Sequence, residues 1–161
     1  MEVIKTYTNS KCELEIAKIR LKRLMDKELE IYCKYFPVTQ IIKEDIVDGG
    51  KKDKDKMALY VHEVNEIDVV TGKSLVQEIE YQRSIVDRIT SYLNDMSETL
   101  SKMHGIEYKL YYEIAVKGVS VSKAVSNIAE IYNKDNRTIW KYHYKKIKKE
   151  VGKLKKYSEN S

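Results

Sequence analysis

The longest heptad repeat in the chain lies between residues 75 and 103, and it constrains the fold more than any other feature. Apolar residues recur there at steps of four and three, with one polar member, Gln82. Such a seam predicts a helix of about 43 Å whose apolar stripe must be covered by another helix. The seam consists of Leu75, Ile79, Gln82, Val86, Ile89, Leu93, Met96, Leu100 and Met103.

Both ends of this helix carry start and stop signals. Ser74 and Gln77 have the S-x-x-Q spacing of a capping box, in which the two side chains bond to each other's backbone N–H groups. Gly105 stands where a C′ glycine is expected to end the helix.

A second seam predicts a helix from Ser10 to Tyr35, opened by the capping box Ser10–Glu13 and ended before Pro37. We expect it to cover the 75–103 seam as an antiparallel hairpin, although a second copy of the chain, in a homodimer, is an open alternative. Its apolar members are Leu14, Ala17, Leu21, Leu24, Ile31 and Tyr35.

The segment between the two seams gives weaker signals. Apolar residues from Val38 to Ile46 predict one or two helical turns, and residues near 48–56 predict an exposed polar loop. A helical period resumes with Met57, Val61, Val64 and Ile67, although residues 60–64 also fit a strand.

Three short helices are predicted after Gly105. The first spans 106–116 and stops at Gly118, and Ser120 or Ser122 caps the second. A turn at 133–135 leads to a last helix, capped by Asp135 or Asn136 and running to about Lys156. Its expected inward stripe is Ile139, Tyr142 or His143, Ile147, Val151 and Leu154.

This layout predicts an all-α protein: an N-terminal helical hairpin or coiled-coil arm over 1–104, a helix-turn-helix DNA-binding unit over 105–157, and a disordered tail over 158–161. Ala129 is small enough for two helices to cross closely, and Ile128 and Ile139 supply an apolar contact across the turn.

Charge is concentrated in the last helix. Residues 134–157 hold ten Lys or Arg against Asp135 and Glu150, a net charge of +8, so the rest of the chain carries 5 − 8 = −3. This asymmetry indicates a polyanionic partner, and we expect double-stranded DNA. The predicted contact residues are Asn136, Arg137, Thr138, Trp140, Lys141, Tyr144, Lys145, Lys148 and Lys149.

Roles within this set follow from position. Asn136, Arg137 and Lys141 lie in the first turns, where base edges are read, and Arg137 suits bidentate contact with guanine. Lys145, Lys148 and Lys149, with Lys146 and Lys153, are expected to hold phosphates. The competing interpretation is a basic helix packed on a bundle, with Trp140 as a core anchor.

The segment 122–147 resembles region four of bacterial sigma factors through Ile128-Ala129-Glu130, the turn and Thr138-Ile139. With the hairpin, the polar loop and the heptad helix, the layout resembles the ArpU/RinA-type late-gene regulators of Gram-positive phages. The resemblance implies a transcription regulator that binds promoter or operator DNA, with RNA polymerase as a further partner. Two departures are the longer stretch 118–125 and Trp140, where a basic residue is common.

No pattern indicates an enzyme, a metal or a cofactor. Thr71-Gly72-Lys73-Ser74 contains the G-K-S of a phosphate-binding loop, but Ile67 stands where that loop needs a glycine, so we expect a turn and a helix cap. The three histidines lack metal-ligand spacing, and Cys12 and Cys33 fit reduced thiols. No signal peptide or membrane span is predicted, so we expect a cytoplasmic protein.

Two other functions fit parts of the sequence. A phage assembly or packaging protein of the small-terminase kind also combines a helix-turn-helix with long helices, although its DNA-binding unit usually comes first. An accessory protein that docks on RNA polymerase through the acidic N-terminal helices is compatible with DNA binding.

Overall fold

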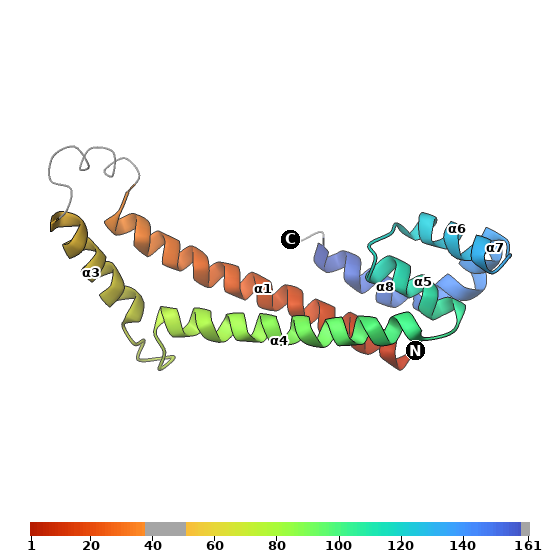
Figure 1. The fold of residues 1–161 in the computed structure, drawn as a ribbon, viewed down its shortest axis with the longest axis horizontal. Helices are drawn as coiled ribbons and strands as arrows, with labels where there is room; N and C mark the ends of the chain where they lie inside the picture. Colours follow the sequence, from red (N-terminus) through yellow and green to blue (C-terminus); the bar gives the residue numbers. More distant parts are fainter. Residues whose placement is uncertain (38–50, 159–161) are drawn as a thin grey trace. The chain divides into compact units, whose positions relative to one another are not determined.

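The computed structural model describes residues 1–37 and 51–158, and every regular element in these ranges is a helix (Figure 1). The all-α prediction is thereby confirmed. The helices are α1 (Glu2–Tyr35), α3 (Lys51–Asn65), α4 (Leu75–Lys102), α5 (Ile106–Ala115), α6 (Val121–Ile131), α7 (Asn136–Thr138), the π-helical stretch η1 (Ile139–Tyr144) and α8 (Lys145–Ser158).

The chain divides into two compact units, which do not follow the expected boundary at 104/105. Unit 1 consists of Met1–Ile16 and Asp87–Ser161, and unit 2 consists of Ala17–Val86. The start of α1 and the end of α4 therefore belong with the C-terminal helices, because their buried side chains help to form the core of those helices.

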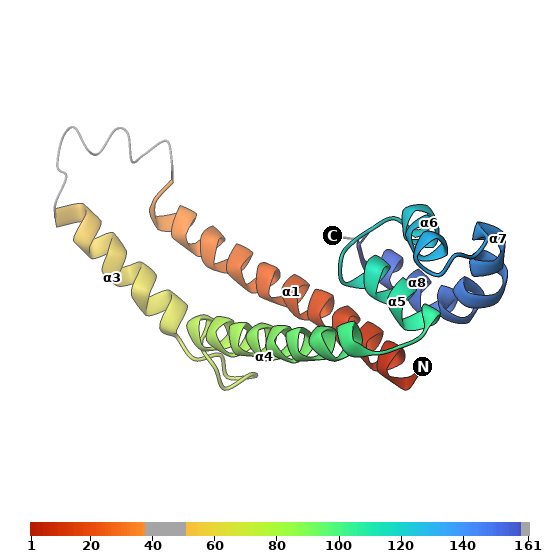
Figure 2. The same cartoon turned by 45° about the vertical axis from the view of Figure 1, so that its right-hand side comes forward.

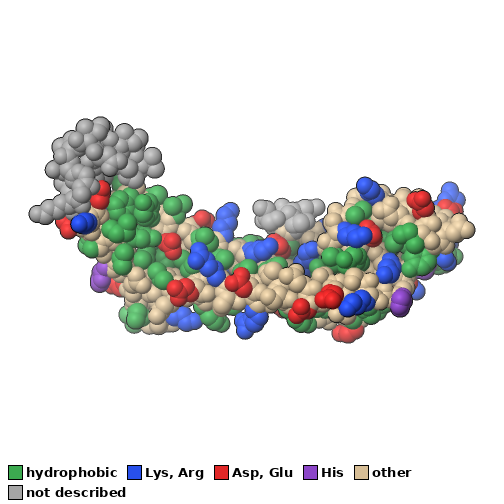
Figure 3. Space-filling model, viewed as in Figure 1, with side chains coloured by type: hydrophobic (Ala, Val, Ile, Leu, Met, Phe, Trp, Pro, Cys, Tyr) green, Lys and Arg blue, Asp and Glu red, His purple; other side chains and the backbone are tan. Residues whose placement is uncertain are grey.

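Unit 2 contains the rest of α1, α3 and the first part of α4. Gln82, the polar member of the seam, is buried, and its amide donates a hydrogen bond to the Ala17 carbonyl oxygen over 3.1 Å. Lys34 of α1 pairs with Glu63 of α3 at 3.1 Å. Hydrophobic side chains gather on the surface over the C-terminal part of α1 and α3 (Figure 3), where Leu29 is 59 % exposed.

Unit 1 holds a core built on α5. The Tyr111 side chain is fully buried, its hydroxyl lies 2.6 Å from Thr8 Oγ1, and its ring meets Tyr7 edge to face at 6.0 Å. Helix α5 packs against α6, η1 and α8, and these helices cluster together in both ribbon views (Figures 1 and 2). Other fully or almost fully buried side chains of this core are Ile4, Leu100, Leu110, Val125, Ile128, Ile139, Ile147 and Val151.

One predicted capping box is confirmed and the other is wrong. Ser74 and Gln77 exchange hydrogen bonds between each side chain and the other's backbone N–H, at 3.0 and 3.2 Å. Ser10, however, is buried in the interior of α1, which begins eight residues earlier. The apolar spacing continues upstream through Ile4 and Tyr7, and their burial in unit 1 decides where the helix starts.

The prediction that Gly105 ends the helix as its C′ residue is wrong, because α4 ends three residues earlier, at Lys102. Gly105 has φ +118° and precedes the first residue of α5 as its N-cap, so the glycine provides the bend between the two helices rather than the C′ position of α4.

The loop predicted near 48–56 is wrong from Lys51 onward, because α3 begins there. Lysine has a good helix propensity, and Asp53 in the first turn lies at the positive end of the helix dipole. Residues 60–64 are helical, which excludes the strand alternative, and Ile67 lies beyond the helix end. The turns predicted over 38–47, residues 48–50 and the tail beyond Ser158 lie outside the described residues.

Part of the heptad seam of α4 is buried within the chain. Ile79 is buried in unit 2, and Leu93 and Leu100 are buried in unit 1. A homodimer through residues 75–103 is therefore not needed to bury these side chains.

Candidate nucleic-acid interface

Helix α6 and the tight turn that follows it determine where the basic C-terminal helices begin. Ser120 is the N-cap of α6, since its hydroxyl accepts a hydrogen bond from the Lys123 N–H, which settles the choice between Ser120 and Ser122. Gly118, with φ +72°, allows the chain to turn between α5 and α6. After α6, Asn133 adopts a left-handed backbone with φ 51°, and the Lys134 N–H closes the turn on the Ala129 carbonyl.

The last helical run begins at a true cap and contains a π-helical turn. The Asp135 carboxylate accepts a hydrogen bond from the Arg137 N–H at 3.4 Å, so Asp135 rather than Asn136 caps the run. Residues 136–158 then continue through α7, η1 and α8. π-Helical turns are rare and often occur at functional sites.

The inward stripe of this run largely matches the sequence prediction. Ile139, Ile147 and Val151 are buried, Leu154 is half-buried, and His143 is half-buried. Tyr142, the other candidate for the stripe, is 58 % exposed. The four-residue spacing from Ile139 to His143 to Ile147 keeps one face of the run against α5 and α6.

The opposite side carries an exposed row of basic residues. Among the residues that the structure describes, no carboxylate pairs with any of them: Arg137, Lys141, Lys145, Lys148 and Lys149. Lys146 and Lys153, predicted as phosphate contacts, instead pair with Glu107 and Glu150 at 3.1 and 3.4 Å. The unpaired charge is therefore concentrated on one set of side chains.

Asn136 and Thr138, two polar residues predicted to contact DNA at the start of the run, are less free than the exposed lysines. Asn136 is exposed, and its amide donates to Ser126 Oγ of α6 at 3.5 Å. Thr138 is half-buried. Asn136 thus ties the beginning of the basic run to the preceding helix while remaining accessible.

A shallow groove brings together five of the nine residues predicted to bind DNA. It is lined by Trp140, Lys141, Tyr144, Lys145 and Lys148. The Trp140 and Tyr144 rings meet edge to face at 5.0 Å. Trp140 is 41 % exposed, whereas its neighbour Ile139 is fully buried, so the interpretation of Trp140 as a core anchor is wrong.

A charged cluster missed by the sequence reasoning attaches the basic run to α5. The Glu107 carboxylate bonds to His143 Nδ1 and to Lys146 Nζ, each at 3.1 Å. Burial raises the pKa of Glu107, but hydrogen bonds from its own backbone N–H, His143 and Lys146 outweigh burial and lower it. Glu107 and His143 lie 36 positions apart in the sequence, so no local pattern could reveal this pairing.

We predict that Glu107→Gln lowers the free energy of unfolding by about 1 kcal/mol near neutral pH, since it removes a half-buried, charge-assisted hydrogen bond acceptor. Because folding lowers the pKa of Glu107, its contribution is complete above the unfolded-state value of about 4.3 and is lost at lower pH. Urea unfolding of wild type and variant from pH 7 to pH 3 should show the difference shrinking below about pH 4.

Glu113→Gln is the matched control, because the Glu113 carboxylate pairs with the exposed Lys117, which lies only four residues later, just beyond the end of α5. If the loss of unfolding free energy in Glu107→Gln is the same from pH 7 to pH 3, the ionised Glu107 carboxylate does not stabilise the fold as described.

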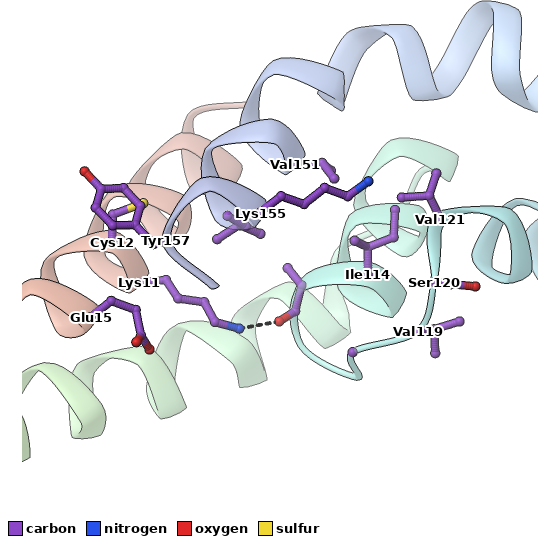
Figure 4. Close-up of a pocket in the computed structure, with 13 residues that line it drawn as sticks. Lys11, Cys12, Glu15, Ile114, Val119, Ser120, Val121, Val151, Lys155 and Tyr157 are labelled. Atoms are coloured by element: carbon purple, nitrogen blue, oxygen red, sulfur yellow. Dashed lines mark hydrogen bonds between the residues drawn. The ribbon is translucent and has the colours of Figure 1, made fainter. Parts of the chain in front are cut away.

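A cavity of about 440 Å³ lies elsewhere in unit 1, between α1, the α5–α6 connection and α8 (Figure 4). Its walls include Ile114, Val121 and Val151, and Cys12 lies at its edge. Burial raises the pKa of the Cys12 thiol, which keeps it protonated and a weak nucleophile near neutral pH. No residue of the exposed basic row lines this cavity.

Within residues 1–37 and 51–158, no group of three or more His, Cys, Asp or Glu side chains is placed to hold a metal ion. No helix in the described part of the chain has the length and apolar character to cross a membrane. No protein-family model, curated protein or solved structure matches this chain.

Proposed function

We propose that this chain is a sequence-specific, double-stranded DNA-binding transcription regulator. In this proposal α6, the turn at 133–135 and the run 136–158 form a helix-turn-helix, and residues 1–104 form a helical hairpin arm. The observation that carries the proposal is the row of exposed cations on a capped helix, unpaired among the described residues. The resemblance to sigma-factor region four and to phage late-gene regulators is part of the proposal, with RNA polymerase as a further partner.

In this proposal the start of the basic run contacts bases and the rest of it contacts phosphates. Arg137 lies in the first turn, is exposed, and carries a guanidinium, two of whose five N–H donors can bond to the O6 and N7 acceptors of guanine. The exposed lysines Lys141, Lys145, Lys148 and Lys149 follow along the run, and we assign them to the phosphates that flank the groove. Phosphate contacts fix orientation and supply affinity, while base contacts supply specificity.

We expect Arg137→Ala to relax the preference at one base pair of the binding site by about 1–3 kcal/mol, because one bidentate contact is lost. Competition among duplexes that differ from the best site by one base pair measures this. Arg88→Ala, an exposed arginine of α4, is the matched control and should leave the preference unchanged. If Arg137→Ala weakens binding to all the duplexes equally, Arg137 contacts phosphate instead of a base.

A further inference from the structure

Trp140 is exposed at a place where packing does not require an aromatic side chain. It is the only tryptophan of the chain and is 41 % exposed, although tryptophan is on average a highly buried residue type. Ile139 and Ile147, both fully buried, attach this stretch to the core. A large indole surface left in water between two core anchors indicates a contact with something outside the chain.

The surroundings of Trp140 hold it in place and give it a charged border. Tyr144, half-buried, meets the indole edge to face at 5.0 Å. Lys141, Lys145 and Lys148 line the same groove and are exposed. A partner of this groove therefore carries negative charge around an apolar group.

Double-stranded DNA presents an apolar group bordered by negative charge at one kind of base. Phosphates supply the negative charge along the groove edges. In the major groove, thymine is the base that presents an apolar group, its 5-methyl, while the other base edges present hydrogen-bond donors and acceptors. An indole has a broad apolar face and a single N–H donor, so it suits thymine better than guanine.

We propose that Trp140 is a specificity-determining residue that contacts the 5-methyl group of thymine in the major groove, with Tyr144 as its positioning residue. This inference rests on the proposed function. It adds a preference for thymine next to the base pair that we propose Arg137 reads, because Trp140 lies three residues further along the helical run.

The test replaces each thymine of the best duplex site by deoxyuridine, one at a time, which removes a single methyl group. Wild type should lose about fourfold in affinity at one or two neighbouring positions, the effect of withdrawing one methyl from an apolar contact. Trp140→Ala should bind the thymine site more weakly and show no further loss with deoxyuridine. Tyr142→Ala, which changes an exposed aromatic residue outside the groove, should keep the wild-type sensitivity.

Trp140 also gives a direct signal, since all tryptophan fluorescence of the chain comes from it. Its emission should change on binding the thymine site and change less with the deoxyuridine site.

Equal affinity of wild type for thymine and deoxyuridine at every position overturns the inference, as does an equal loss in Trp140→Ala. The inference is also overturned if wild type binds the separated single strand more tightly than the duplex and Trp140→Ala loses this preference. In that case Trp140 stacks on bases instead. Duplex binding with unchanged fluorescence overturns this inference alone, whereas absence of duplex binding by wild type overturns the proposed function as well.

Discussion

Replacing Lys141, Lys145 and Lys148 together by alanine should lower the affinity for duplex DNA on the order of 10²–10³-fold at about 0.1 M salt. Each lysine that neutralises a phosphate releases condensed counterions, and each contributes about 0.9 to the slope of log affinity against log salt concentration. The slope should therefore become shallower by about 2.7. The three ammonium groups are exposed and share one groove, so their removal costs no core packing.

The matched control replaces Lys22, Lys27 and Lys54, three exposed lysines of unit 2. Both triple variants lower the formal net charge from +5 to 5 − 3 = +2, so a general effect of charge is the same in the two. Titrations by fluorescence anisotropy at four salt concentrations give both affinity and slope. Similar losses in the two variants contradict a localised interface on the 136–158 run.

Ile139→Ala should lower the free energy of unfolding by about 2–5 kcal/mol, the largest effect on stability that we expect from a single substitution in this region. The Ile139 side chain is fully buried at the start of η1, where this stretch packs against α5 and α6. The truncation removes apolar contacts and leaves a cavity that the surrounding helices fill only in part. Denaturant unfolding followed by Trp140 fluorescence reports directly on this part of unit 1.

Ile131→Ala is the control, because Ile131 is 70 % exposed near the end of α6 and makes the same change in side-chain volume. Its free energy of unfolding should stay within about 0.5 kcal/mol of wild type. A loss below about 1 kcal/mol for Ile139→Ala, similar to that of Ile131→Ala, shows that the run 136–158 is not anchored as described.

Features with a local cause could be predicted from the sequence. The seam of α4, the capping box at Ser74 and the end of α1 before Pro37 each depend on residues within a few positions of one another. The same holds for the turn at 133–135 and for the exposed row of lysines, because one amphipathic helix separates the buried Ile139 and Ile147 from the charges.

Features with a distant cause could not be predicted. Ser10 has the spacing of a capping box, but tertiary packing of Tyr7 and Thr8 against Tyr111, more than 100 residues away, extends α1 past it. Residues 51–56 contain no apolar residue, so the helical period that begins at Met57 does not predict that α3 starts at Lys51. The bond between His143 and Glu107 forms only because α5 lies beside the last helical run, and no local pattern predicts the π-helical turn of η1.

Two predicted phosphate contacts have carboxylate partners that no local pattern revealed. Lys146 and Lys153 look equivalent to their neighbours in the sequence, yet each pairs with a carboxylate in the structure. Trp140 was predicted as a contact residue, and its exposure excludes the competing interpretation as a core anchor.

Selection of bound sequences from a pool of random duplex DNA tests the central claim most directly, since it asks whether the chain recognises duplex DNA by sequence. We predict a defined motif that contains a guanine, whose preference depends on Arg137, and an adjacent thymine. Recovery of no motif, with binding that is equal for all sequences and disappears as salt is raised, contradicts it and leaves the basic run as a nonspecific electrostatic surface.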